Sequence, residues 1–215
     1  MIKFSAIFFI MFFSACSFKT PPNEWQYKSV NAYESYKKNF LSSNNSLADS
    51  DLKRAVGHAK KSSNLDQLAR IYLGKCAINN SVGIEDSCTE FKELESLVDD
   101  QTMHSYYLLI VNKLTYDDIE NLPDTYKSFA YSYINKDYKQ AVKEMFDIQT
   151  ITSKLIAANI VKSNMSVEDI EKLLEEVSFY GYKKTVVYWL KVMKTKVEDT
   201  LKIQKIDKKI KILES

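Results

Sequence analysis

Glycine and proline are scarce in this chain, with only 4 Gly and 3 Pro among 215 residues. Average usage of roughly 7% and 5% would supply about 26 of them. Tight turns between strands depend on these residues, so their shortage argues against a β-rich fold. It also leaves no room for a glycine-rich phosphate-binding loop. Lys, Glu, Leu and Ala recur at helical spacing instead, which predicts an all-α protein.

Residues that carry catalytic chemistry are equally sparse. The only histidines are His58 and His104, and neither has a second His four residues on, as a helical zinc motif requires. Neighbouring acids such as Asp99 and Asp100 point away from each other on a helix, whereas paired-carboxylate hydrolysis needs two carboxyls about 5–9 Å apart across a cleft. We therefore predict a protein that is not an enzyme, with no metal, no cofactor and no small-molecule substrate.

The chain has no large excess of either positive or negative charge. The chain has 30 Lys and Arg against 28 Asp and Glu, finely mixed along the sequence. Such a balance gives no electrostatic reason to expect nucleic acid or another general polyanion as the partner.

The longest apolar block, from Phe4 to Ala15, is too short to span a bilayer, which takes roughly 20 apolar residues. With Lys3 before it, the block fits the apolar region of an export signal. The stretch Phe13-Ser14-Ala15-Cys16 then resembles the bacterial lipobox, from which it departs at Phe13, where Leu is usual. The alternative is an ordinary secretory signal followed by an incidental cysteine.

The lipobox resemblance implies that residues 1–15 are cleaved and that Cys16 carries a diacylglyceryl anchor. Ser17 stands where an Asp would signal inner-membrane retention, so the expected location is the outer membrane, facing the periplasm. Residues 16–22 form a short tether, of which the six residues after Cys16 reach only about 20 Å. Residues 23–215 are expected to form a single helical domain close to the membrane.

Cys76 and Cys88 are the other cysteines, and they flank a turn sequence, Asn79-Asn80-Ser81-Val82-Gly83. An even pair in an exported chain predicts a disulfide across a helical hairpin. The alternative is a pair of free thiols buried as small apolar groups.

Three segments look alike and suggest a repeat of about 43 residues: Asp51 to Val56, Asp137 to Val142 and Gly181 to Val186. Each has a large residue three positions before a small one, near the expected start of a helix. Residues 131–145 resemble the tetratricopeptide repeat but depart from it at Lys136, where Gly is usual. Together these patterns predict antiparallel helical hairpins stacked as a short TPR-like α-solenoid.

Tyrosine is frequent, with 14 residues, and is favoured at protein interfaces. The alternative is packing between hairpins with the hydroxyl reaching water. The residues expected to bind a partner are Tyr106, Tyr107, Tyr133, Tyr138, Tyr182 and Trp189. The last helix carries Ile203, Ile206 and Ile210 between lysines, so it caps the stack, lies on anionic lipid or binds a partner.

The expected function is therefore a membrane-anchored scaffold or accessory of an envelope complex, held by Cys16 and binding a protein partner. Small helical lipoproteins of bacterial envelopes are similar as a class, and that similarity carries no activity. The competing hypothesis is a cell-wall-acting enzyme or a ligand-binding lipoprotein.

Overall fold

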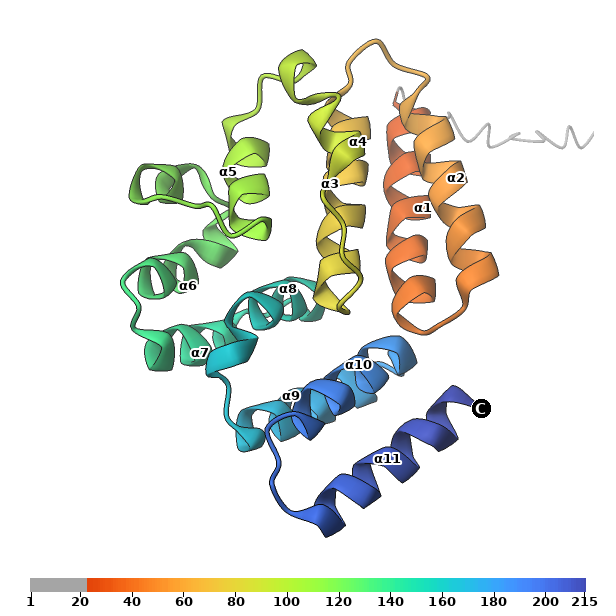
Figure 1. Ribbon diagram of the computed structural model, residues 1–215. Helices are drawn as coiled ribbons and strands as arrows, with labels where there is room; N and C mark the ends of the chain where they lie inside the picture. Colours follow the sequence, from red (N-terminus) through yellow and green to blue (C-terminus); the bar gives the residue numbers. More distant parts are fainter. Residues whose placement is uncertain (1–22) are drawn as a thin grey trace, which may run out of the picture.

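The computed structural model describes residues 23–215, and within this range the chain forms helices joined by loops, with no strand (Figure 1). This confirms the all-α prediction for a single domain. The signal segment, the lipobox and Cys16 lie outside the described residues. In chain order the α-helices are α1 (Glu24–Leu41), α2 (Asn45–Ala59), α3 (Asp66–Ser81), α4 (Thr89–Lys92), α5 (Gln101–Ile110), α6 (Asp124–Ile134), α7 (Tyr138–Asp147), α8 (Ile151–Val161), α9 (Val167–Phe179), α10 (Lys183–Lys194) and α11 (Thr200–Glu214). Short 3-10 helices are η1 (Glu95–Leu97), η2 (Tyr116–Asn121) and η3 (Lys162–Asn164).

Consecutive helices pair as hairpins, most clearly α1 with α2, α6 with α7 and α9 with α10 (Figure 1). In a solenoid each hairpin contacts only its neighbours along the chain. Here α8 packs against α3, and α10 packs against the far end of α1. These contacts close the later helices back onto the first ones, so the predicted TPR-like stacking is not confirmed.

The largest part of the core is built from α6 to α11, with contributions from α1, α3 and α5. Trp189, Phe129, Leu155, Ile170 and Leu173 are fully buried at its centre. None of the helices in residues 23–215 has both the length and the apolar character needed to cross a bilayer. Two smaller apolar clusters lie around α3, one shared with α4 and α5 and the other with α1 and α2.

The three repeat-like segments have one feature in common in the structure. Their small residues, Ala55, Ala141 and Thr185, are all fully buried, which lets a neighbouring helix approach closely. Asp137 and Tyr182 stand directly before α7 and α10, so these two segments lie at helix starts, as predicted, and the Asp137 side chain also caps its helix. The first copy differs, because Asp51 lies in the middle of α2 and not at its start.

The apolar spacing of residues 84–98 predicts one helix, and the structure corrects this. The chain has no regular helix over 84–88, where Asp86 is held by the side chains of Asn79 and Asn80. Only the four residues of α4 and the three residues of η1 follow. The side-chain hydrogen bonds and the Cys76–Cys88 bridge fix a conformation that the apolar spacing did not reveal.

Several helices end in a left-handed residue that is not glycine. Ser43, Asn112 and Lys136 have φ values of 68°, 57° and 61°. After each of them the next amide donates to a carbonyl five residues back, as Asp137 N does to Ser132 O at 3.0 Å. This is the Schellman arrangement, in which glycine is the usual left-handed residue. A chain with so little glycine makes these ends with strained residues.

Lys136→Gly is therefore expected to stabilise the protein by about 1 kcal/mol, because a left-handed L-residue costs roughly 1–2 kcal/mol that glycine avoids. Chemical denaturation at fixed pH measures the change in unfolding free energy. Lys139→Gly, inside α7, is the opposite control and should destabilise by a similar amount. Equal destabilisation by both would show that Lys136 carries no backbone strain.

Candidate functional site

The aromatic residues predicted to bind a partner divide into buried and surface groups. Trp189 is fully buried, and Tyr107 and Tyr182 are each 9% exposed. Tyr107 packs against Phe91 beneath α5, and Tyr182 packs into the core at the start of α10. These three side chains pack in the interior of the domain, so almost none of their surface is accessible to a partner.

Tyr106 also faces inward. Its ring stacks on that of Tyr126 with centroids 5.4 Å apart, where α5 meets α6. Burial raises the pKa of the Tyr126 hydroxyl above its ordinary value, and it raises the pKa of the Tyr106 hydroxyl well above it. Tyr106 is thus part of a neutral, packed contact between helices, as the packing alternative for the tyrosines anticipated.

Tyr133 and Tyr138 lie at the surface, on the turn between α6 and α7. Their rings meet edge to face with centroids 5.8 Å apart. Tyr116 from η2 and Tyr131 from α6 form a second edge-to-face pair at 5.9 Å, and they are 49% and 57% exposed. We call these four residues, Tyr116, Tyr131, Tyr133 and Tyr138, the tyrosine surface; Tyr131 and Tyr133 are two positions apart on α6, so the two pairs lie toward different sides of that helix.

Helix ends and hydrogen bonds fix the tyrosine surface. The Tyr133 hydroxyl donates to Asn112 Oδ1 at 2.9 Å, and the Tyr116 hydroxyl donates to Asn135 Oδ1. The Asp137 carboxylate caps α7 by accepting from Gln140 N at 3.1 Å, which sets the position of Tyr138. The Thr115 backbone and hydroxyl both donate to Asp118, which caps η2 beneath Tyr116.

The tyrosine surface offers apolar area and hydroxyls at low conformational cost, which suits protein recognition. Tyr116 and Tyr131 are exposed, whereas Tyr133 and Tyr138 are half-buried against the core. Tyr133 and Tyr138 were predicted from the sequence, whereas Tyr116 was missed. Its neighbour Tyr131 lies 15 positions further along the chain, so no local pattern joins the two. The left-handed turn at Lys136 brings the ends of α6 and α7 together there.

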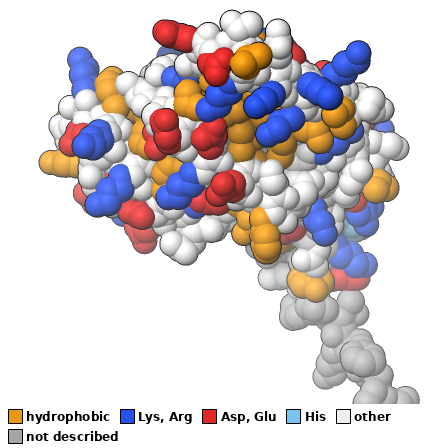
Figure 2. Space-filling model, turned by 90° about the horizontal axis from the view of Figure 1, so that it is seen from below, with side chains coloured by type: hydrophobic (Ala, Val, Ile, Leu, Met, Phe, Trp, Pro, Cys, Tyr) orange, Lys and Arg blue, Asp and Glu red, His pale blue; other side chains and the backbone are white. Residues whose placement is uncertain are grey.

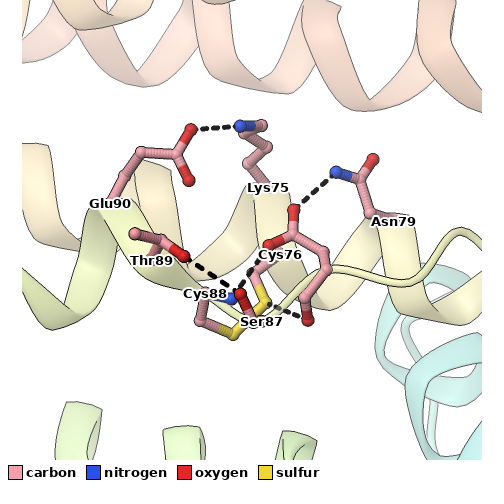
Figure 3. A network of polar contacts seen from close by, with 8 residues as sticks. Lys75, Cys76, Asn79, Ser87, Cys88, Thr89 and Glu90 are labelled. Carbon is pink, nitrogen blue, oxygen red and sulfur yellow. Dashed lines mark hydrogen bonds and ion pairs between the residues drawn. A yellow bond between two sulfur atoms is a disulfide. The ribbon is translucent and has the colours of Figure 1, made fainter.

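The predicted disulfide joins Cys76 of α3 to Cys88, with Cα atoms 5.2 Å apart (Figure 3). Asp86 completes the loop, because its carboxylate accepts from Asn79 Nδ2 at 2.7 Å and from Cys88 N at 2.9 Å. Lys75 and Glu90 form an ion pair beside it. The two sulfurs and Asp86 lie close together, but bridged cysteines offer no thiolate to a metal. The disulfide and these hydrogen bonds stabilise the conformation of the loop.

The nearest arrangement to a catalytic pocket surrounds His104. Its Nδ1 lies 2.7 Å from Glu95 Oε1, and Asp100 is close by on the same rim. The hollow measures about 110 Å³, whereas ligand pockets usually enclose about 300–1,000 Å³. Asp100 is already engaged, since it caps α5 and pairs with Arg70. The other histidine, His58, has its pKa lowered by burial.

Two larger depressions lie side by side along α10, of about 560 and 550 Å³, and they share Tyr188 and Lys191. Most of their lysines already have partners. Lys191 pairs with Glu214 at 2.6 Å, Lys196 donates to Ser163 O at 3.0 Å, and Lys184 lies over the Phe40 ring at 3.6 Å. We call these two depressions together the basic furrow.

Comparison with known proteins found no match: no protein-family model fits the chain, and no curated protein or solved structure is significantly similar to it. The geometry of residues 23–215 and the sequence therefore carry the functional argument.

Proposed function

We propose that this protein is a lipid-anchored envelope protein whose helical domain binds another protein through the tyrosine surface. Cys16 holds it on the periplasmic face of the outer membrane, and residues 17–22 keep the domain near the bilayer. The domain acts as a scaffold or accessory of an envelope complex and performs no chemistry itself.

The Cys76–Cys88 disulfide is the observation that supports export. Disulfides persist in oxidising compartments such as the bacterial periplasm and are rare in the cytosol. The disulfide and the resemblance of the N-terminal segment to an export signal therefore support the same location. The lipobox resemblance of Phe13 to Cys16 adds the anchor.

The tyrosine surface is the observation that supports protein binding. It is open, aromatic and rigid, and it lacks the enclosed acidic cavity that hydrolysis needs. The basic furrow along α10 favours the second candidate, a ligand-binding lipoprotein that takes an anionic molecule. Its lysines are largely committed to partners within the chain, so protein binding through the tyrosines is the better-supported function.

Cys16→Ser is expected to release the protein from the membrane fraction after a high-salt wash and to abolish incorporation of radiolabelled palmitate. A single acyl chain binds only marginally, so a chain lacking all of them should become soluble. High salt is used because it screens any electrostatic attachment. Retention and labelling equal to those of the unsubstituted chain would contradict the anchor.

Tyr131→Ala is expected to reduce partner capture at least about tenfold with little loss of stability. Truncating an aromatic hot spot typically costs 2 kcal/mol or more of binding, while an exposed side chain contributes little to folding. The measurement is quantitative recovery of crosslinked partners from intact envelopes. Tyr27→Ala, which is 63% exposed on α1, is the matched control and should leave capture unchanged. Equal recovery with both variants would place the binding site elsewhere.

A further inference from the structure

Charge is divided unevenly along the described chain, although the total is nearly neutral. Residues 183–215 contain ten lysines and four acids, a net charge of +6. Residues 23–182 contain 18 basic and 24 acidic residues, a net charge of −6. The basic part comprises α10 and α11, so the two parts of the molecule carry opposite net charge.

The outer face of α11 concentrates this charge. Ile206 and Ile210 are buried against the core, which fixes the orientation of the helix. Leu201, Lys205, Lys208 and Ile212 follow one another at spacings of 4, 3 and 4 residues, so they form one stripe on the opposite, solvent-facing side. Leu201 and Ile212 are 67% and 64% exposed and lie about 16 Å apart along the helix.

Four lysines on and beside this stripe are available. Among the described residues, Lys205, Lys208, Lys209 and Lys211 pair with no carboxylate, whereas Lys202 pairs with Glu171 on α9. The acids of α11 are turned away from the stripe, since Asp207 and Glu214 pair with Lys194 and Lys191 of α10. Figure 2, a view from below, shows Lys and Arg side chains gathered around exposed hydrophobic ones.

A further apolar feature borders the stripe. Ile212 also lines a hollow of about 380 Å³ between α9, α10 and α11, together with Leu174, Val186 and Leu190. Phe179, which follows Ser178 of this hollow at the end of α9, is 87% exposed, and Tyr180 next to it is 47% exposed. Aromatic residues of this kind favour the boundary between lipid and water.

The residue types favour a lipid surface over a protein or a nucleic acid. Lysine is depleted in protein interfaces, where arginine and aromatic residues are enriched. Residues 183–215 contain no arginine, the residue that recognises phosphates and carboxylates bidentately. Flexible lysines on a convex helix, with isolated aliphatic side chains between them, suit a diffuse anionic plane.

We propose that the outer face of α11 docks on the headgroups of an anionic lipid bilayer, with Leu201 and Ile212 inserted and the four unpaired lysines above them. This goes beyond the proposed function, which it uses only to place a bilayer within reach. Each lysine near an anionic surface contributes roughly a fivefold change in partitioning. Four lysines therefore suffice to hold the helix on the membrane once the chain is already tethered.

Docking through α11 determines how the domain lies. The chain enters α1 at the end remote from α10 and α11 (Figure 1), and α1 has 18 residues, which corresponds to a length of about 27 Å. A domain tethered before α1 and docked through α11 is held at two places remote from each other, which restricts how it can turn on the bilayer. The lipid anchor and α11 then act as two separate attachment points.

The test places a bimane fluorophore at position 212 through Ile212→Cys in the full chain, reconstituted with a nitroxide-labelled lipid as quencher. Vesicles of phosphatidylcholine are compared with vesicles that contain about a third of phosphatidylglycerol. We expect quenching only with the anionic lipid and its loss at high salt. A fluorophore at position 50 on α2, introduced through Ser50→Cys, is the matched probe and should stay unquenched. The unsubstituted chain, treated in the same way, shows how much fluorophore attaches to Cys16.

The double variant Lys205→Gln, Lys208→Gln should lower the equilibrium constant for docking roughly 30-fold. This constant is obtained from the ratio of quenched to unquenched fluorophore. Lys53→Gln with Lys113→Gln removes the same charge from the acidic part of the molecule and should change nothing. The proposal fails if the probe at 212 stays unquenched in anionic vesicles, or if it is quenched equally in phosphatidylcholine. Failure of lipidation at Cys16 is measured separately by palmitate labelling, so the two outcomes are distinct.

Discussion

Trp189→Ala is expected to destabilise the protein by about 3–5 kcal/mol, the cost typical of removing a large aromatic side chain from a core. Trp189 is fully buried and lies on α10, where it meets the core built by α6 to α11. Its removal leaves a cavity that several helices must share. For a domain of this size, 1 kcal/mol corresponds to roughly 2–4 °C, so Tm should fall by about 10 °C.

Trp189→Phe is the matched variant that separates packing from hydrogen bonding. The indole nitrogen Nε1 is buried and has no hydrogen-bond partner within the described residues. Removing it therefore breaks no bond, and the loss should stay near 1–2 kcal/mol for the reduced volume. Calorimetry of both variants checks this. If Phe costs as much as Ala, the indole nitrogen is hydrogen-bonded in solution and polar contact, not volume, holds α10.

The sequence predicted the helices well wherever an apolar stripe and a boundary residue coincided. Ser166 and Asp169, which have the spacing of a capping box, form one at the start of α9, and Pro123 directly precedes α6. Ile206 and Ile210 bury α11 against the core as a cap. These features depend on residues three or four positions apart, which a sequence displays directly.

The arrangement of the helices was beyond such reasoning. Periodicity shows that a face is apolar but not which helix covers it, so Trp189 and Tyr182 were assigned to a partner when α10 buries them in its own core. The loop before α4 was assigned to a helix because its side-chain hydrogen bonds to Asp86 depend on residues of α3. For the candidate site, Tyr133 and Tyr138 were predicted, while Tyr116 needed the fold to join them.

A series of three Gly→Ala substitutions is expected to separate backbone strain from steric contact, because the chain offers one glycine for each case. Gly57 lies within α2 with no neighbour near a new Cβ, so alanine should stabilise by about 0.5–1 kcal/mol. Gly181 has φ 68° in open space, so alanine should cost about 1 kcal/mol from the backbone alone. Gly83 has both a left-handed backbone and a close neighbouring side chain.

Gly83→Ala is expected to cost about 2–5 kcal/mol, the sum of a left-handed backbone and overpacking of 1–3 kcal/mol. Gly83 has φ 75°, and a Cβ there would lie 2.8 Å from Tyr188 Cδ2. The ring cannot withdraw easily, since its hydroxyl donates to Asn159 Oδ1 at 2.8 Å and accepts from Lys162 Nζ at 3.3 Å.

Denaturant unfolding of Gly83→Ala, Tyr188→Ala and the double variant gives the coupling between the two positions. With the ring gone, the alanine at 83 should cost only what it costs at 181, because the steric part has been removed. If Gly83→Ala costs no more than Gly181→Ala in the presence of Tyr188, the ring moves aside freely. The contact between the α3–α4 turn and α10 would then be loose, and the basic furrow that Tyr188 separates into two depressions would be open to rearrangement.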